Sequence, residues 1–575
     1  MGAIFRKLFK IFRRFIQLLF SRMIIVALLI ILQIIWIWLV FEALAEYNTI
    51  IQICTAVLGV ILVLVVVNKD EVPEYKMPWL LVIVISPILG GVLFIFFGSN
   101  QPGRRMKREY MRLEREAGRV ICQNEKTLAA LEEKDAVAAA QAKYIYESSR
   151  SPVYDGTHTQ YFPMGEDMFP AMVRELKKAE KFVFLEYFII EEGRFLNTIL
   201  EILQRKMQEG VEVRIMYDDI GSIGKVRMGY ARKLRKMGFN AQVFRPFLPF
   251  ISTVHNNRDH RKIMVIDNRV AFTGGINLAD EYINEKLRFG TWKDTGIMVE
   301  GDCVAEFTCM FLTLWDLQAR QLSDYPKYAE YHPVSAENVD TPLTETAGVS
   351  EEQTMIAAEQ AAAEGATGEA VQTDSCAVAA ASFRAPLLSV RERGYVACFG
   401  DGPAPFYEEQ VGKNIYLNIL NNATDYVYIS TPYLVCDNEL LSAIRLAARR
   451  GVDVRLITPH IPDKKVVYLI TRSSYSSLME AGVKIYEYTP GFIHAKNFLS
   501  DDKYAVVSTI NLDYRSLVHH FECGVWMYDT PTVAKIKGDF LRTLADSREV
   551  PAEEAELNLA QNIVKSLVQV ITPLL

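Results

Sequence analysis

The sequence predicts an α/β protein with two tandem lobes related by pseudo-twofold symmetry, preceded by N-terminal transmembrane helices. Three observations lead to this prediction. Three long uncharged runs occupy the first hundred residues, a strand–helix–strand pattern occurs twice in the remainder, and each copy is followed by the same polar motif, H-x-K-x4-D. Alternating strands and helices are typical of α/β domains, and uncharged runs of about 20 residues are typical of membrane-spanning helices.

The first hundred residues are predicted to form a membrane anchor. Residues 23–41, 50–67 and 78–98 contain no charged side chain, and each is about long enough to cross a hydrocarbon core of roughly 30 Å. Soluble core helices rarely lack charge over such lengths. Residues 1–22 place basic and apolar side chains at helical spacing, which indicates either a basic amphipathic helix on an anionic bilayer or a charge cluster that orients the anchor.

The charge pattern leaves the topology open. Basic residues precede the first apolar run, and four more lie within residues 104–108 after the third run. The positive-inside rule therefore favours the cytoplasm for both ends, which three complete crossings cannot provide. Either residues 78–98 bend back at the proline and glycines of 86–91, or residues 23–41 lie partly in the interface. Both alternatives describe a multi-pass protein of the cell membrane, with cytoplasmic lobes favoured.

The second half of the chain repeats the first at offsets of 241 to 244 residues. Each repeat is predicted to run strand, helix, strand, helix, strand, with largely parallel pairing and a separate hydrophobic core. The matched segments are residues 181–190 with 425–435, residues 210–217 with 451–458, and residues 237–246 with 481–490.

Between the repeats lies a segment of unusual composition. Residues 336–382 contain nine acidic residues and no Lys or Arg, with almost no bulky apolar side chain, so we expect a flexible linker. The whole chain has a net charge of −6, and removing these nine acids leaves +3, so the bulk charge does not decide the partner. The predicted segments are an anchor 1–100, a helical connector 101–150, lobe one 151–335, an acidic low-complexity insert 336–385, lobe two 386–550 and a C-terminal amphipathic helix 551–575.

The repeated motif supplies the candidate chemistry. It reads His260, Lys262 and Asp267 in the first lobe, and His494, Lys496 and Asp501 in the second, and an Asn follows each Asp by ten residues, at Asn277 and Asn511. One match among eight histidines would be weak, but two at equivalent points of an internal repeat are specific. His and Lys two residues apart on a strand point to the same face, so two such strands can bring both pairs to one cleft.

These side chains suit a phosphodiester. Two ammonium groups, from Lys262 and Lys496, would neutralise its oxygens, and the amides of Asn277 and Asn511 would add hydrogen bonds. One imidazole would attack phosphorus and form a phosphohistidine, while the other protonates the leaving alkoxide and then activates the incoming alcohol.

A neutral nucleophilic imidazole needs its second nitrogen held. Asp294 and Glu522, each downstream of its motif's Asn, are candidates for this orienting role, although ordinary surface carboxylates are an equally good explanation of both. No acidic cluster suited to Mg²⁺ or Zn²⁺ accompanies the motifs, so neither a metal nor another cofactor is predicted.

The paired motifs resemble the phospholipase D superfamily, and the wider sequence is similar to its bacterial cardiolipin synthases over roughly residues 55–545. The resemblance implies two phospholipase D-like lobes and transfer of a phosphatidyl group between two molecules of phosphatidylglycerol, giving cardiolipin and glycerol in the bilayer. By the same analogy His260 is the nucleophile and His494 the acid and base, while Asp267 and Asp501 hold the site together.

Other functions remain open at this stage. Phospholipase D and phosphatidylserine synthase would use the same intermediate with another acceptor, and a catalytically dead scaffold would not need the paired motifs. A nuclease of the superfamily is disfavoured by the apolar runs and by the lack of a dense basic, aromatic-interleaved groove, so no nucleic-acid partner is predicted. The sequence does not indicate an oligomeric state.

Overall fold

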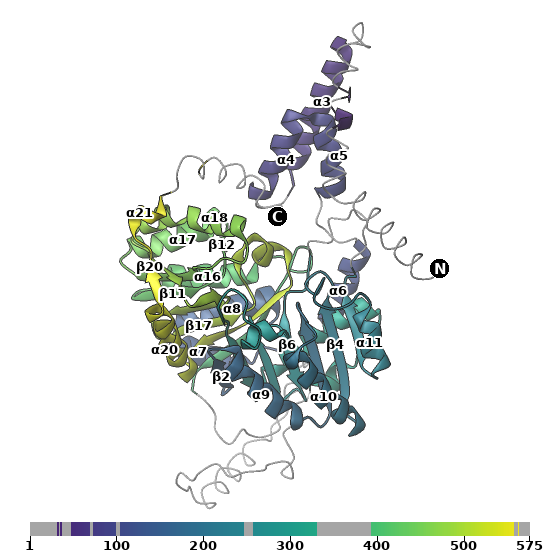
Figure 1. Cartoon of the computed structure of the whole chain (residues 1–575), viewed down its shortest axis with the longest axis vertical. Helices are drawn as coiled ribbons and strands as arrows, with labels where there is room; N and C mark the ends of the chain where they lie inside the picture. Colours follow the sequence, from purple (N-terminus) through teal and green to yellow (C-terminus); the bar gives the residue numbers. More distant parts are fainter. Residues whose placement is uncertain are drawn as a thin grey trace, which may run out of the picture.

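The computed structural model describes residues 31–33, 35–36, 48–69, 73–98, 104–246, 257–329, 393–556 and 562. Figure 1 shows two α/β lobes packed against each other, with a group of apolar helices projecting from them. The predicted segment 1–22, most of the run 23–41, the insert 336–385 and all but the start of the C-terminal helix 551–575 lie outside these residues.

Within the described residues, lobe one contains a seven-stranded mixed sheet. Its three strands from the first repeat, β3, β4 and β5, pair in parallel, and the others are antiparallel. The expectation of largely parallel pairing therefore holds for these three strands only. The order across the sheet is β2 (His158–Phe162), β9 (Gly296–Glu300), β7 (Val270–Gly274), β6 (Lys262–Ile266), β3 (Phe182–Tyr187), β4 (Glu212–Asp218) and β5 (Asn240–Phe244).

Lobe two repeats this order and adds a strand at each edge. The parallel strands are again those of the predicted repeat, β11, β13 and β14. The first edge strand, β1, comes from the start of lobe one, so the chain crosses between the lobes at residues 155–158. The order is β1 (Tyr154–Asp155), β10 (Tyr395–Asp401), β19 (Glu522–Tyr528), β17 (Tyr504–Ser508), β16 (Asn497–Ser500), β11 (Tyr426–Ser430), β13 (Asp453–Pro459), β14 (Lys484–Tyr488) and β20 (Ser547–Glu549).

Amphipathic helices cover the sheets. In α10, buried Phe195, Leu196, Ile199 and Leu203 recur at helical spacing, and the Asp280 carboxylate accepts hydrogen bonds from the first backbone N–H groups. The predicted connector forms three helices in its described part. The helices are α6 (Arg104–Ala117), α7 (Glu125–Lys134), α8 (Ala136–Ser149), α9 (Gly165–Lys177), α10 (Arg194–Gln208), α11 (Tyr230–Lys236), α12 (Val304–Ala319), α13 (Tyr325–Ala329), α16 (Val411–Asn422), α17 (Asn438–Arg449), α18 (Lys465–Ser473), α19 (Tyr475–Met479), α20 (Pro531–Ala545) and α21 (Ala552–Ala555).

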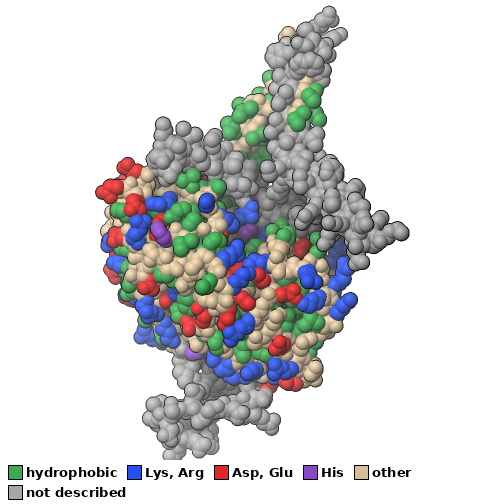
Figure 2. Space-filling model, viewed as in Figure 1, with side chains coloured by type: hydrophobic (Ala, Val, Ile, Leu, Met, Phe, Trp, Pro, Cys, Tyr) green, Lys and Arg blue, Asp and Glu red, His purple; other side chains and the backbone are tan. Residues whose placement is uncertain are grey.

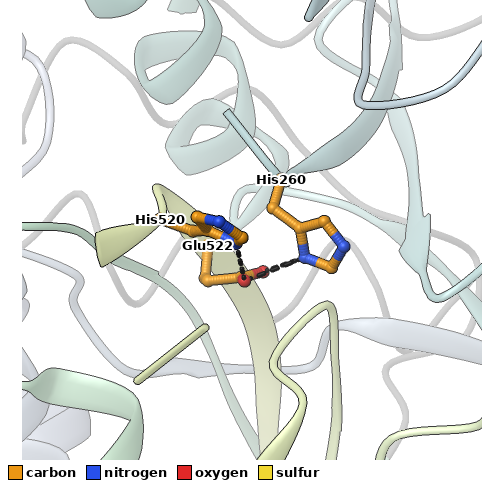
Figure 3. Close-up of side chains that lie close together, drawn as sticks. All are labelled: His260, His520 and Glu522. Carbon is orange, nitrogen blue, oxygen red and sulfur yellow. Dashed lines mark hydrogen bonds and ion pairs between the residues drawn. The ribbon is translucent and has the colours of Figure 1, made fainter. Parts of the chain in front are cut away.

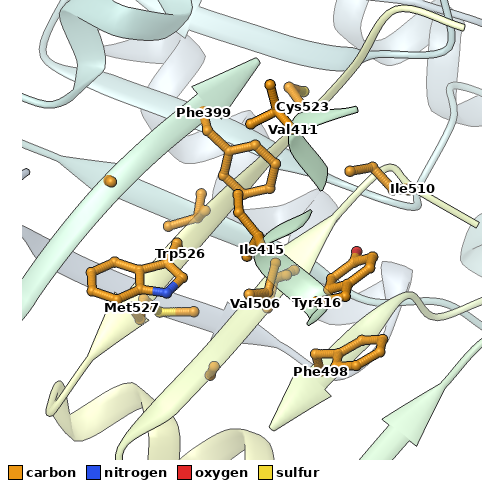
Figure 4. Close-up of a cluster of buried hydrophobic side chains, with 14 of the residues drawn as sticks. Phe399, Val411, Ile415, Tyr416, Phe498, Val506, Ile510, Cys523, Trp526 and Met527 are labelled. Carbon is orange, nitrogen blue, oxygen red and sulfur yellow. The ribbon is translucent and has the colours of Figure 1, made fainter. Parts of the chain in front are cut away.

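The two lobes share a hydrophobic core. One continuous cluster of buried side chains includes Phe184 and Val265 from the first sheet and Val427 and Trp526 from the second. Figure 4 shows part of it, where α16 packs on the second sheet and the Tyr416 ring stacks on Phe498 at 4.0 Å. A second cluster fills the outer face of lobe one. The expectation of a separate core in each lobe is therefore wrong for the inner faces, where the lobes pack on each other through apolar side chains.

The N-terminal helices form a hairpin beside one long helix. In the described part of the chain, one helix is long and apolar enough to cross a membrane, α3 (Asn48–Val67). The run 78–98 is divided between α4 (Pro73–Ile85) and α5 (Pro87–Phe97), which meet at Ser86. A side chain added at Gly90 would collide with the backbone of Ile83, so α5 turns back closely along α4.

The hairpin reaches about halfway along α3. At its open end, the Lys69 ammonium donates to the Gly98 carbonyl, and at its tip Pro87 lies against Gly59 in the middle of α3. Figure 2 shows mainly apolar side chains on these helices, in contrast to the mixed charges of the lobes. Exposed apolar side chains on this scale indicate contact with a membrane or a partner.

Candidate active site

Each motif histidine lies where the two lobes meet. His260 precedes β6, and its N–H donates to the Phe521 carbonyl of lobe two at 2.9 Å. His494 follows the short strand β15 (Gly491–Ile493), which pairs with β8 (Thr291–Lys293) of lobe one, and its N–H donates to the Lys293 carbonyl at 2.7 Å. The backbone of each histidine is therefore anchored to the opposite lobe.

The ring nitrogens are held in the same crossed manner. The Nδ1 of His260 lies 2.8 Å from a carboxylate oxygen of Glu522, and the Nδ1 of His494 lies 2.6 Å from Asp294. Both carboxylates are fully buried. The structure thus places both sequence-predicted orienting residues on a histidine, and each acts across the lobe boundary. With Nδ1 as the donor to the carboxylate, the Nε2 lone pair of each ring is left for chemistry.

The motif aspartates do not contact the histidines. The Asp267 carboxylate accepts three hydrogen bonds, each of 2.7 Å, from the backbone N–H groups of residues 180–182, at the entrance to β3. Asp501 does the same for residues 424–426, at the entrance to β11. Each aspartate therefore ties the motif strand to its neighbour in the sheet.

Both histidines open on one cavity of about 310 Å³ between the lobes. Asn277 and Asn511 also line it, but their amides differ. Asn277 accepts from the Ile189 N–H at 2.9 Å and donates to the Tyr282 hydroxyl at 2.9 Å, so its amide is engaged within the protein. The buried carbonyl oxygen of Asn511 has no hydrogen-bond partner within the described residues. Of the two, Asn511 is the better placed to bind a ligand.

The motif lysines are almost fully buried beside the histidines. Lys262 and Lys496 have exposed fractions of 1% and 2%, and each ammonium donates to the carbonyl of the histidine two residues before it. Burial lowers the pKa of Lys262 to about 8 and that of Lys496 to about 7. Two desolvated positive charges beside one cavity strongly favour the binding of an anion there.

The same surroundings keep the imidazoles neutral. Burial, followed by the positive charges of Lys262 and Lys496, lowers the pKa of His260 well below its ordinary value. Burial and then Lys496 lower the pKa of His494 to about 4, although Asp294 opposes this shift. Neutral rings with one free nitrogen are suited to nucleophilic attack and to proton acceptance.

Comparisons with known proteins point to one family. A family profile described as the cardiolipin synthase PLD-like domain matches residues 172–315 and again residues 416–544, and one described as phospholipase D-nuclease N-terminal matches residues 57–99. A Streptococcus mutans serotype c protein, named only as uncharacterized, is 42% identical over 515 residues, covering 89% of this chain and 99% of that protein.

Two relatives with named activities also span most of the chain. The cardiolipin synthase of Alkalihalophilus pseudofirmus is 29% identical over 490 residues, covering 85% of this chain and 86% of that protein. The cardiolipin synthase of Geobacillus kaustophilus is 30% identical over 522 residues, covering 90% of this chain and 92% of that protein. This chain belongs to the bacterial cardiolipin synthases of the phospholipase D superfamily. The resemblance inferred from the paired motifs is confirmed.

Within this family fold, the sequence analysis missed an aromatic ring beside each histidine. The backbone N–H of His260 donates to the carbonyl of Phe521, and that of His494 donates to the carbonyl of Lys293. The residues that precede these two carbonyls in the chain, His520 and Trp292, therefore occupy equivalent positions. The His520 ring lies 5.3 Å from His260, and the Trp292 ring lies 5.5 Å from His494. Extending the alignment of Asp294 with Glu522 by two residues would have found this pair.

His520 faces the carboxylate that holds His260 without a hydrogen bond to it. Figure 3 shows both rings directed at Glu522, and the Nδ1 of His520 lies 3.6 Å from its nearer oxygen. Burial lowers the pKa of His520 to about 3, so this third imidazole is also neutral near pH 7. The equivalent Trp292 offers no such nitrogen lone pair.

The same three residues have the composition of a metal site. Ligand atoms of His260, His520 and Glu522 lie within 4.8 Å of one another, and two His with one Glu can hold a divalent ion. The ion would compete for His260 with the catalytic role that the paired motifs indicate, and it would lie beside the Lys262 and Lys496 ammonium groups. Phosphoryl transfer through the two histidines needs only side chains, and activity measured with a chelator tests whether a metal ion is required.

Proposed function

We propose that the chain is a membrane phosphatidyltransferase that makes cardiolipin and glycerol from two molecules of phosphatidylglycerol. The observation that carries the proposal is an interlobe cavity lined by two neutral imidazoles, each held by a carboxylate of the opposite lobe, with two buried ammonium groups beside them. The cavity's positive charge suits a phosphodiester, and its paired imidazoles suit double displacement.

In the first step, the Nε2 of His260 attacks the phosphorus of the donor lipid. A P–N bond forms, the P–O bond to the headgroup glycerol breaks, and His494 gives its proton to the departing oxygen. Binding of the anionic phosphodiester raises the pKa of His494 from its low value in the empty cavity, so that the ring can carry this proton. Glu522 balances the positive charge of the phosphorylated His260 ring.

In the second step, the acceptor hydroxyl replaces the glycerol. His494, now neutral, takes the hydroxyl proton, the oxygen bonds to phosphorus, and the P–N bond breaks to restore His260. Lys262, Lys496 and the side-chain N–H groups of Asn511 stabilise the negative charge on the phosphoryl oxygens in both steps. Water or serine in place of the lipid hydroxyl would give the hydrolase or the phosphatidylserine synthase.

The purified protein in detergent micelles that contain labelled phosphatidylglycerol tests this proposal. We expect cardiolipin and free glycerol in equal amounts, and the rate should be unchanged by a chelator. Phosphatidic acid as the only product would establish the hydrolase instead, whereas loss of activity with the chelator and recovery with Zn²⁺ would refute the metal-free chemistry.

We further propose a multi-pass topology with cytoplasmic lobes. In this arrangement residues 23–41 and α3 cross the bilayer in opposite directions, and the α4–α5 hairpin enters only as far as the middle of α3. The two charged ends then both lie inside, including the exposed basic residues 105–108 of α6. This assigns the break at Ser86 to a re-entrant hairpin, one of the alternatives that the sequence left open.

Single cysteines, introduced into a variant in which all eight native cysteines are replaced, test the topology in intact cells. A membrane-impermeant maleimide should label a cysteine in the loop 42–47 and leave one at Ser99 unlabelled until the membrane is permeabilised. Labelling of both positions in intact cells would show that residues 78–98 cross completely.

A further inference from the structure

Cardiolipin synthesis places two phosphates at the active site. The donor lipid is attacked at its phosphorus, while the acceptor keeps its own phosphodiester and offers a hydroxyl of its headgroup. The motif lysines serve the reacting phosphate. A second anion brought into a partly desolvated cavity needs positive charge of its own.

Four lysine and arginine side chains line the cavity wall. Two of them, Lys225 and Arg288, come from lobe one, and the other two, Lys464 and Arg515, come from lobe two. The lobe-one cations are closely neutralised: the Lys225 ammonium lies 2.5 Å from Glu191 and 2.9 Å from Glu281, and the Arg288 guanidinium lies 2.9 Å from Glu281. They form a structural ion-pair cluster at that rim.

On the lobe-two rim, which also carries the carboxylates of Asp463 and Asp513, Lys464 is paired less closely than the lobe-one cations are. The Lys464 side chain is 62% exposed, and its carboxylate neighbour, Asp463, lies 3.8 Å away and already accepts a hydrogen bond of 2.7 Å from Tyr433. The Lys464 ammonium also lies over the Tyr433 ring at 5.1 Å, and both residues line the cavity.

Arg515 lies at the foot of the membrane hairpin. It begins the π-helical turn η5 (Arg515–His519), and residues on both sides of it contact α4: the Tyr75 ring lies 5.9 Å from Tyr514 and 5.0 Å from His519. The lobe-two rim of the cavity is therefore the one joined to the apolar helices. A lipid whose chains remain in the bilayer would bring its headgroup phosphate to this rim.

We propose that Lys464 and Arg515 form the binding site for the phosphate of the acceptor phospholipid. The site lies on the same cavity as His260 and His494, so the bound acceptor's hydroxyl reaches the phosphohistidine while its phosphate stays at the rim. An anionic lipid headgroup is thereby preferred over water and over neutral alcohols. This inference rests on the phosphatidyl transfer proposed above.

Two water-soluble acceptors test the site through one intermediate. Glycerol and glycerol 3-phosphate both offer a hydroxyl, but only the second carries a phosphate. The wild-type protein with phosphatidylglycerol as donor should use glycerol 3-phosphate in preference to glycerol. In the double variant Lys464→Ala, Arg515→Ala, the kcat/KM for glycerol 3-phosphate and for acceptor phosphatidylglycerol should fall about tenfold, with exchange of labelled glycerol within about twofold of wild type.

Lys465, the adjacent exposed lysine that does not line the cavity, provides the matched control. Lys465→Ala should leave the preference intact, and Lys464→Arg should keep most of it. If glycerol exchange falls together with the phosphate-bearing acceptors, or if neither falls, the acceptor site is refuted. A wild-type protein that uses glycerol 3-phosphate but forms no cardiolipin would refute the proposed function and not the acceptor site. In that case the preference for glycerol 3-phosphate over glycerol still tests the site.

Discussion

The two halves of the active site have the same backbone arrangement but differ in the residues beside the reacting rings. Both histidines bond to a carbonyl of the opposite lobe and to the carboxylate that follows it. Beside His260, however, stand a glutamate and a second imidazole, whereas His494 has an aspartate and an indole. The repeat therefore fixes where the imidazoles lie, and the flanking residues are where the halves acquire separate roles.

The largest effect should come from the histidines themselves. His260→Ala and His494→Ala should each lower kcat/KM by about 10³-fold or more, since each removes a group that forms or breaks a bond. A quench with SDS at neutral pH, where the phosphohistidine P–N bond survives, distinguishes the two histidines during turnover of a donor with a good leaving group. His494→Ala should accumulate the covalent phosphatidyl-protein and His260→Ala should not. The reverse result would exchange the two roles.

The lysines come next. Lys262→Met and Lys496→Met should each lower kcat/KM by about 10²-fold, because a positive charge aimed at the phosphoryl oxygens is lost. Lys496→Met should also raise the melting temperature more than Lys262→Met does, since Lys496 has the more strongly lowered pKa, about 7 against about 8.

The sign of this stability effect depends on pH. The folded pKa of Lys496 lies below its unfolded value, so below pH 7 the buried ammonium opposes folding fully, and between pH 7 and the ordinary pKa of 10.5 the wild type regains stability. The advantage of Lys496→Met should therefore be largest at pH 6 and vanish above the ordinary lysine pKa. Calorimetry at pH 6 and pH 9 measures it, and an equal gain at both would contradict the assignment.

The crossed carboxylates should matter slightly less. Glu522→Gln and Asp294→Asn keep the shape but lose the charge that holds each ring, which should lower kcat/KM by about 10- to 100-fold. A donor with a good leaving group needs no acid in the first step, so it should restore that step in Asp294→Asn and leave Glu522→Gln slow. Equal rescue of both variants would mean that the carboxylates do not serve different histidines.

The pH profile separates the half-sites without any mutation. In the free protein the Lys496 ammonium is lost at about pH 7 and that of Lys262 at about pH 8, so kcat/KM should fall as pH rises through this window. The decline of kcat should begin at a higher pH than the decline of kcat/KM, because the bound phosphodiester raises both lysine pKa values. Lys496→Arg should retain its charge and shift the first decline upward; an unchanged profile would assign that decline to another group.

The smallest effect should come from the residues that differ. His520→Asn should change kcat by only a few-fold, because Glu522 still holds His260, and it should shift the pH profile slightly by changing the surroundings of that carboxylate. Trp292→His creates the mirror arrangement at Asp294. If His520→Phe and His520→Asn behave identically in both rate and profile, the ring serves packing alone.

Much of this arrangement could be predicted from the sequence. The motif spacing located His260 and His494, and the repeat located the parallel strands that precede each motif. The crossed pairing could not be predicted, because His260 and Glu522 are 262 residues apart and belong to different lobes. Periodicity within one repeat says nothing about which face meets the other copy. For the same reason the shared core and the exchange of β1 were missed.

The anchor was predicted in part. Pro87 and the glycines that follow it indicated a bend, and the structure places the break between α4 and α5 there. That the hairpin returns beside α3 depends on contacts of Gly59 and Gly90 with other segments, which hydropathy does not encode. The lobe-two rim was missed because Lys464 and Arg515 are unremarkable surface charges until the fold places them on the cavity of the histidines.

The crossed carboxylates have a consequence for how the protein loses activity. Because each ring is fixed by the lobe that does not carry it, a small separation of the lobes releases both histidines at once while each sheet stays hydrogen-bonded. Catalysis should therefore disappear at a lower denaturant concentration than helix and strand content does, as a local opening that precedes global unfolding. Any condition or binding partner that separates the lobes should therefore lower the catalytic rate before it unfolds either sheet.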